Sequence, residues 1–503
     1  MASPRYPSLF QVNTRVRLAE LSAELGRPAT LDDVPDADLD RLAADGFDLV
    51  WFLGVWQTGE AARDVSRSNL GWLEEYRRVL PDFKESDVCG SCFAIREYRV
   101  HADFGGDAAL ARLRRRLADR GLRLVLDFVP NHMAPDHPWV TAHPEWFVAG
   151  SEELLASQPQ NYRRIQNAPG GGSRVLAYGR DPYFDGWPDT FQLNYGNPAL
   201  QEAMLGELSR IARQCDGVRC DMAMLVLPEV FRKSWGISAD PFWPRATAAV
   251  RAGVPGFLFL AEVYWDLEGT LQQQGFDYTY DKRLYDRLEH GAARPVREHF
   301  FAGLDFQDRL ARFLENHDEP RAAATFPADV HRAAAVLTFL SPGLRFLHQG
   351  QREGKRVKIP VHLGRGPVEA PDADVAAFYV RLLECLKDPA FRDGDWRLLE
   401  CRPAWDGNPT SDDFVAFAWT GPGRERRLVA VNYSGHRSQC YVALPWDDLP
   451  GRAWRLADRM SPAVYDRQGD DLARQGLYLD MPPWGHHVFD VSCTDWPSPF
   501  SAT

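Results

Sequence analysis

Four short apolar segments of the chain each run into polar residues that could carry acid–base chemistry. Two carboxyl groups about 5–5.5 Å apart can break a glycosidic bond with retention, because one attacks the anomeric carbon while the other protonates the leaving oxygen. Carboxylates at the ends of neighbouring parallel strands meet that spacing without special geometry. Taken singly, each residue could instead cap a helix or occupy a turn. The residues are Asp127 with Asn131 and His132, Arg219 with Asp221, Glu262, and His317 with Asp318.

The elements that would position these groups follow a repeated helix-then-strand pattern. Leu110, Leu113 and Leu117 fall on one face of a predicted helix, and an apolar run at 124–129 follows it. Such repetition predicts a parallel sheet. An open, doubly wound sheet would also fit, but a closed barrel collects all its strand ends on one face and so explains polar groups after four separate strands. Further strands are predicted at 49–53, 217–222, 257–261, 311–314 and 344–347.

The predicted fold class is therefore α/β, a (β/α)8 TIM barrel over residues 1–395. Residues 133–197, after the third strand, are rich in Gly, Pro, Trp and Asp and are too long for an ordinary connection, so they predict an inserted subdomain. From 396 to 503 the pattern changes to short alternating segments separated by turn residues. This predicts a C-terminal antiparallel β-sandwich domain.

Four motifs, in this order, resemble the conserved regions of the α-amylase family, glycoside hydrolase family 13. The resemblance extends over essentially the whole chain and implies a sugar-cleaving site. The motifs are DFVPNH at 127–132, GVRCD at 217–221, AEVYW at 261–265 and ENHD at 315–318.

The resemblance implies a role for each of three carboxylates. Asp221 would be the nucleophile, Glu262 the general acid/base, and Asp318 the group that holds the distorted sugar through its hydroxyls. Arg219, two residues before Asp221 on the same strand face, can favour the ionised nucleophile by its fixed charge. Glu262 must instead be protonated when substrate binds, and we expect neighbouring carboxylates and partial burial to favour that form.

The resemblance also implies residues that bind the sugar. His132 and His317 would contact it in the cleavage subsite, and Phe93 stands where the family commonly has a tyrosine platform. Tyr264 and Trp265 directly follow Glu262 and could stack on further sugar rings.

Departures from the family pattern argue against calcium. Met224 and Leu225 stand where many members have Lys-His, and Gln192 replaces an aspartate that helps to bind calcium. Asn131 remains, but a hard dication needs several oxygen ligands with charge among them. The sequence therefore predicts no metal and no cofactor.

Composition narrows the partners and the location. A formal net charge of −12 argues against nucleic acid, and the absence of an apolar leader or of about 18 consecutive apolar residues argues against a membrane. Eight scattered cysteines, including Cys89 and Cys92 as a lone C-x-x-C, do not have the spacing of a disulfide scaffold. We expect a cytoplasmic protein; its oligomeric state stays open.

Three functional interpretations follow. The first is a retaining hydrolase of α-glucosidic bonds in α-glucans or short oligosaccharides. The second is a glucosyltransferase or a glycoside phosphorylase. A retaining hydrolase and both of these enzymes form the same covalent intermediate, so the motif residues do not separate them. The third is a non-catalytic sugar-binding protein, which would be expected to have lost the catalytic carboxylates. The chain retains all three of them.

Overall fold

Eight parallel strands close into a barrel in the computed structural model, which describes residues 4–166 and 172–494. Neighbouring strands are hydrogen-bonded in the order β1-β14-β13-β12-β11-β10-β5-β2, so the predicted TIM barrel is confirmed. The strands are β1 (Ser8–Asn13), β2 (Leu49–Leu53), β5 (Arg123–Phe128), β10 (Gly217–Cys220), β11 (Leu258–Ala261), β12 (Tyr278–Tyr280), β13 (Leu310–Arg312) and β14 (Leu344–His348).

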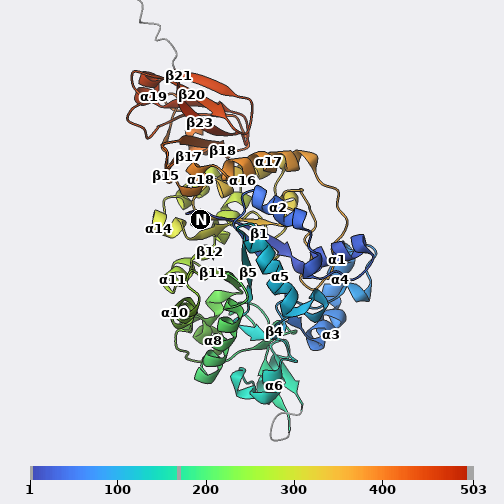
Figure 1. Cartoon of the computed structure of the whole chain (residues 1–503). Helices are drawn as coiled ribbons and strands as arrows, with labels where there is room; N and C mark the ends of the chain where they lie inside the picture. The colour runs from blue at the N-terminus through green and yellow to red at the C-terminus, as the bar shows by residue number, and fades with distance from the viewer. Residues whose placement is uncertain (1–3, 167–171, 495–503) are drawn as a thin grey trace, which may run out of the picture.

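Helices surround the barrel (Figure 1), and their buried residues are mainly apolar. In α8 the side chain of Asn197 caps the first turn, Pro198 opens the helix, and Leu200 and Leu208 are among the residues buried against the sheet. The larger helices of the barrel are α1 (Thr14–Leu25), α2 (Asp36–Ala44), α5 (Gly106–Ala118), α8 (Pro198–Ala212), α10 (Trp243–Gly253), α12 (Lys282–Glu289), α16 (Ala328–Phe339) and α17 (Ala373–Leu386).

Two long excursions leave the barrel at the carboxyl ends of its strands. The first follows β2 and includes helices α3 (Glu60–Ser68) and α4 (Leu70–Val79). The second follows β5 and is the segment predicted at 133–197, of which residues 167–171 lie outside the described part. It holds α6 (Pro138–Ala142), α7 (Glu152–Ser157), the hairpin β7 (Tyr162–Ile165) and β8 (Arg174–Ala177), and the short pair β6 (His132–Met133) and β9 (Phe191–Gln192).

An antiparallel β domain follows α18 (Pro389–Asp393), and β15 begins at Asp395, next to the predicted boundary at 396. Residues 495–503 of that predicted domain lie outside the described part. A six-stranded sheet, β15-β17-β18-β23-β20-β21, packs through an apolar core on a three-stranded sheet, β16-β19-β22. The strands are β15 (Asp395–Leu398), β16 (Cys401–Arg402), β17 (Phe414–Thr420), β18 (Arg426–Asn432), β19 (Ser438–Val442), β20 (Ala453–Asp458), β21 (Val464–Gln468), β22 (Leu477–Met481) and β23 (His486–Thr494).

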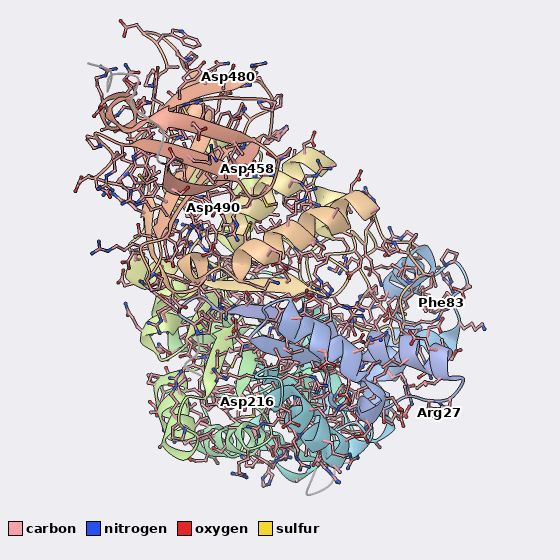
Figure 2. The ribbon with its side chains drawn as sticks, turned by 45° about the horizontal axis from the view of Figure 1, so that its top comes forward. Arg27, Phe83, Asp216, Asp458, Asp480 and Asp490 are labelled. Carbon is pink, nitrogen blue, oxygen red and sulfur yellow. The ribbon has the colours of Figure 1, made fainter. Side chains whose placement is uncertain are left out.

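The β domain joins the barrel at the end of the molecule opposite α6 (Figure 1). The carboxylate of Asp388, which caps α18, accepts a 2.9 Å hydrogen bond from Arg427 and also pairs with Arg459. Asp490 pairs with Arg427 at 2.8 Å and lies on the barrel side of the β domain in Figure 2. The indole of Trp419 donates to the carbonyl of Leu340 in the barrel at 2.8 Å. Both charge and apolar packing therefore hold the two parts together.

Residues 4–166 and 172–494 contain no helix that is both long and apolar enough to cross a membrane. They also contain no group of three or more His, Cys, Asp or Glu side chains placed to hold a metal ion.

Candidate active site

One buried guanidinium joins the two carboxylates predicted to do the chemistry. Arg219 Nη1 donates to Asp221 Oδ1 at 2.5 Å, and Arg219 Nη2 lies 2.7 Å from Glu262 Oε2. Asp221 directly follows β10 and Glu262 directly follows β11, and these strands are neighbours in the barrel. The structure therefore brings the predicted pair together at the carboxyl ends of adjacent strands, as the barrel topology requires.

Aromatic rings enclose this arginine inside the barrel. The guanidinium carbon lies 5.3 Å from the ring centres of both Trp51 and Phe93 and 5.6 Å from that of Tyr280. The Tyr280 hydroxyl accepts a hydrogen bond from Arg219 Nε at 3.2 Å. Cation–π contacts of this kind stabilise a desolvated cation and fix its orientation.

The Glu262 carboxylate receives two further hydrogen bonds. The Tyr264 hydroxyl donates to Oε1 at 2.8 Å, and the backbone N–H of Met222 donates to Oε2 at 2.7 Å. Met222 has a φ of +43°, in the left-handed region that non-glycine residues rarely adopt. This backbone conformation turns the N–H toward Glu262, and such strain is typical of functional sites.

A line of hydrogen bonds from β14 through β1 to the loop after β13 orients His317 toward Asp318. His348 donates from Nδ1 to the amide oxygen of Gln11 at 2.6 Å, and the amide nitrogen of Gln11 donates to Nδ1 of His317 at 2.9 Å. The proton of His317 is then on Nε2, which lies 3.0 Å from Asp318 Oδ2. Gln11 and His348 are buried members of the site that the sequence analysis did not identify.

The electrostatics of the three carboxyl groups differ. Burial raises the pKa of Asp221 to about 8, Arg219 opposes this rise, and the charge of Glu262 adds to it. Enclosure also acts to raise the pKa of Asp318, but His317 and Arg219 outweigh it and hold that pKa below its ordinary value. Arg219 thus acts on Asp221 in the expected direction, yet burial is the larger effect. The protonated form of Asp221 is therefore favoured at neutral pH.

A cavity of about 300 Å³ opens above these groups. His132, buried and packed 5.1 Å from the ring of Trp187, forms part of the wall, and burial lowers its pKa to about 4, so it is neutral. Arg219 and His317 contact the carboxylates but do not line the cavity, and the partly exposed Trp265 does not line it either. The predicted residues that line it are Phe93, His132, Asp221, Glu262, Tyr264 and Asp318.

Several lining residues were not predicted as a group. Trp72 lies on α4, Trp187, Asp189 and Thr190 lie in the inserted segment, and Val361 and His362 follow β14. They come from three separate segments of the chain, so no spacing along the sequence links them.

At the position that the resemblance links to calcium, the oxygens of Asn131 already accept hydrogen bonds. The side-chain oxygen of Asn131 accepts a hydrogen bond from the Gln192 amide at 2.9 Å, and the same amide also donates to the Asn131 carbonyl at 2.9 Å. An amide donor thus occupies the oxygens that a cation would need, and Gln192 contributes no charge.

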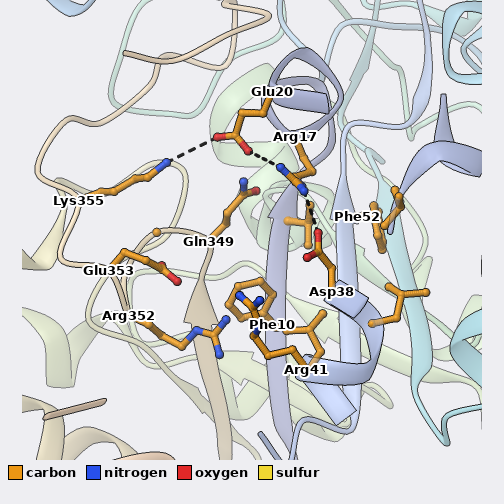
Figure 3. Close-up of a pocket in the computed structure, with 15 residues that line it drawn as sticks. Phe10, Arg17, Glu20, Asp38, Arg41, Phe52, Gln349, Arg352, Glu353 and Lys355 are labelled. Carbon is orange, nitrogen blue, oxygen red and sulfur yellow. Dashed lines mark hydrogen bonds and ion pairs between the residues drawn. The ribbon is translucent and has the colours of Figure 1, made fainter. Parts of the chain in front are cut away.

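A second cavity, of about 260 Å³, lies on the outside of the barrel between β1, α1, α2 and residues 349–355 (Figure 3). A chain of ion pairs runs along it from Lys355 through Glu20 and Arg17 to Asp38. Each of these carboxylates is paired with a cation, and none belongs to a strand end of the barrel. This cavity therefore does not have the arrangement that glycosidic chemistry requires, and the candidate site is the one at Asp221.

A (β/α)8 barrel that gathers three carboxylates in one cavity is typical of TIM-barrel proteins that act on sugars. The family model for the alpha amylase catalytic domain matches residues 85–359, more than half of the chain. The chain belongs to the α-amylase family.

Curated relatives within this family have more than one activity. The chain is 28% identical over 310 residues to an alpha-1,4-glucan:maltose-1-phosphate maltosyltransferase of Burkholderia pseudomallei, covering 59% of this chain and 23% of that protein. It is 22% identical over 297 residues to alpha-amylase 3 of Dictyoglomus thermophilum, covering 55% and 56%. The matched region thus spans 23% of the length of the first relative and 56% of the length of the second.

Solved structures share the whole fold. A noncanonic maltogenic alpha-amylase from Thermotoga neapolitana superposes with a TM-score of 0.68 at 17% identity, covering 97% of this chain and 99% of that one. An alpha-amylase from Lactobacillus plantarum gives 0.67 at 21% identity, with 96% and 98% covered. At these identities the likeness concerns the fold.

Proposed function

We propose that the chain is a retaining enzyme that cleaves α-glucosidic bonds of α-glucans or short oligosaccharides through a covalent glycosyl-enzyme intermediate. The observation that carries the proposal is the arginine shared by Asp221 and Glu262 at the ends of adjacent barrel strands. Curated relatives are amylases and maltosyltransferases, which act on the same kind of bond.

The reaction needs the proton on Glu262 and the charge on Asp221. Because one guanidinium faces both carboxyl groups, moving the proton from Asp221 to Glu262 leaves the charge of the cavity unchanged. Glu262 then gives this proton to the leaving oxygen while an Asp221 oxygen bonds to the anomeric carbon. Asp318, held ionised beside His317, is placed to accept hydrogen bonds from sugar hydroxyls.

In the second step Glu262 acts as a base. It removes a proton from water, and the water oxygen displaces Asp221 from the anomeric carbon. A sugar hydroxyl in place of water gives a glucosyltransferase, and the maltosyltransferases among the relatives favour this as the second candidate. Phosphate is the less suitable acceptor, since the cavity has more carboxylates than cations.

The test is to trap the intermediate. A 5-fluoro-α-glucosyl fluoride should label the peptide that contains Asp221, as seen by mass spectrometry, and Asp221→Asn should abolish the label while its circular dichroism spectrum stays native. Labelling elsewhere, or undiminished turnover by Asp221→Asn, would refute the assignment. Product analysis with and without sugar acceptors then separates hydrolysis from transfer.

We further propose that no calcium is bound at Asn131, because the Gln192 amide satisfies its oxygens. Activity and melting temperature should be the same after dialysis against EDTA and after addition of calcium; a melting temperature several degrees higher with calcium would contradict this. We also propose a cytoplasmic location. All eight cysteines are free thiols, which reducing compartments maintain.

A further inference from the structure

Three segments that leave the barrel separately meet at one side of the cavity. Trp72 from α4 stacks on His362, with ring centres 4.3 Å apart and planes 25° from parallel. The Nε2 atom of His362 lies 3.7 Å from Oδ2 of Asp189, which belongs to the inserted segment. All three residues line the same cavity as Asp221 and Glu262. We call Trp72, Asp189 and His362 the end wall.

The end wall rests on a braced support. The backbone N–H of Cys89 donates to the carbonyl of His362 at 2.9 Å, and Gly364 donates to Asp87 at 2.8 Å. Arg365 forms two 2.8 Å hydrogen bonds to the carboxylate of Asp87. The segment that carries His362 is therefore fastened to the excursion that carries Trp72. A wall built on paired backbone and charged hydrogen bonds does not move aside at low cost.

One carboxylate of the end wall has unused hydrogen-bonding capacity. Asp189 is 3% exposed, and among residues 4–166 and 172–494 its Oδ2 has no hydrogen-bond partner. His362, at 3.7 Å, is too far to donate a hydrogen bond, and leaving a buried acceptor without one is costly, so its partner is expected to come with the substrate. A sugar presents hydroxyl donors of this kind. The end wall thus has a polar group suited to the hydroxyls of a terminal ring, beside the flat face of Trp72.

Exposed aromatic residues lie close to the proposed acid along the chain. Trp265 follows Glu262 by three residues, and 37% of its surface is exposed. Its ring centre is 5.0 Å from that of Tyr183, and Tyr183 and Phe184 are 58% and 73% exposed. Trp265 also has a φ of +64°, in the left-handed region that non-glycine residues rarely adopt. Exposed aromatic faces of this kind stack on sugar rings, and the proximity of Trp265 to the proposed acid in the sequence favours contact with the leaving group.

We infer that the end wall limits the donor side to one glucosyl unit, so that the enzyme acts on the terminal, non-reducing residue of its substrate, while the rim formed by Tyr183, Phe184 and Trp265 supports the leaving group or acceptor. The inference rests on the proposed retaining chemistry at Asp221. The cavity volume of about 300 Å³ lies at the small end of the range for ligand sites. Trp72, Asp189 and His362 are then specificity-determining residues.

Glycosyl fluorides test the donor side alone, because fluoride is a small leaving group that makes no use of the rim. We expect kcat/KM for α-glucosyl fluoride to exceed that for α-maltosyl fluoride at least 100-fold. Equal values, or a preference for the maltosyl donor, would overturn the inference while leaving the retaining chemistry intact. Turnover of neither fluoride, with no label at Asp221, would instead refute the proposed function.

Variants of the end wall complete the test. His362→Ala and Trp72→Ala should each raise the maltosyl-to-glucosyl ratio of kcat/KM at least tenfold. Because Trp72 and His362 both pack near Tyr76 of a small apolar cluster, the circular dichroism spectrum and melting temperature of each variant must first show that it is folded. Trp405→Ala, at a 56% exposed tryptophan of the β domain, is the matched control and should leave the ratio unchanged. An unchanged ratio in folded His362→Ala and Trp72→Ala would exclude the end wall as the determinant.

Discussion

The hydrogen bond from Tyr264 to Glu262 offers a sharp test of the proposed acid. Tyr264→Phe removes only the hydroxyl that donates to Glu262 Oε1 at 2.8 Å and keeps the ring. A hydrogen bond to a charged group contributes about 1.5–3 kcal/mol. Glu262 becomes a carboxylate as it gives up its proton, so most of this stabilisation is lost in the transition state. We expect kcat/KM to fall about 10- to 150-fold.

The leaving group and the pH separate this effect from a structural one. Aryl α-glucosides with poor leaving groups need protonation most and should show the largest loss. The alkaline limb of the rate profile should move upward by about 1–2 pH units, because one donor to the ionised pair is gone. Tyr195→Phe is the matched control, since its buried hydroxyl has no hydrogen-bond partner among the described residues. A loss that is the same for all leaving groups, with the limb unmoved, would refute the role of Glu262 as acid.

Three further changes test the electrostatics and the packing. Burial raises the pKa of Asp221 to about 8, so the contribution of this group to stability is fully present below about pH 4 and is lost as the pH rises through 8. The Asp221→Asn variant should therefore melt a few degrees above the wild type at pH 9 and close to it at pH 4. The reverse order of melting temperatures would contradict the raised pKa. Gln11→Leu leaves the ring nitrogens of His317 and His348 without their buried partner and should lower the free energy of unfolding in urea by about 2–6 kcal/mol; a loss below 1 kcal/mol would show that the line of hydrogen bonds is unimportant. Asp388→Asn keeps the helix cap but loses the charge facing the β domain. Arg427 and neighbouring donors outweigh burial and lower the pKa of Asp388, so this substitution should cost about 1–3 kcal/mol of stability above pH 4, and the cost should disappear as the pH falls further. A cost that does not depend on pH would argue against the ion pairs.

Six of the eight barrel strands could be predicted because each is a short, mostly apolar segment that follows a helical pattern, as in 49–53 and β2. The strand β1 was not predicted: it is the first element of the barrel, so no helical pattern precedes it, and Gln11 interrupts its apolar residues. The strand β12 spans only Tyr278–Tyr280, too short to show a pattern. The run at 311–314 extends beyond β13, which ends at Arg312, because the chain there turns to present the polar residues of ENHD.

The candidate site was predictable to the extent that its residues lie within motifs. Asp221 and Glu262 each follow a strand directly, so the barrel alone places them together. The end wall carries no such signal, because Trp72 and His362 are 290 positions apart and meet only through the packing of two excursions. The direction of the Asp221 pKa shift was also out of reach, since it depends on how far burial exceeds the effect of Arg219.

The single guanidinium shared by the carboxylates has a consequence for inhibition. Arg219 supplies one positive charge to the three carboxyl groups. A sugar mimic with a permanent positive charge in its ring would bring a second cation into the cavity. Because burial raises the pKa of Asp221 to about 8, this carboxyl becomes charged as the pH rises through 8, so inhibition by such a mimic should tighten there while turnover declines. The same buried arginine would thus give binding and catalysis opposite pH dependences.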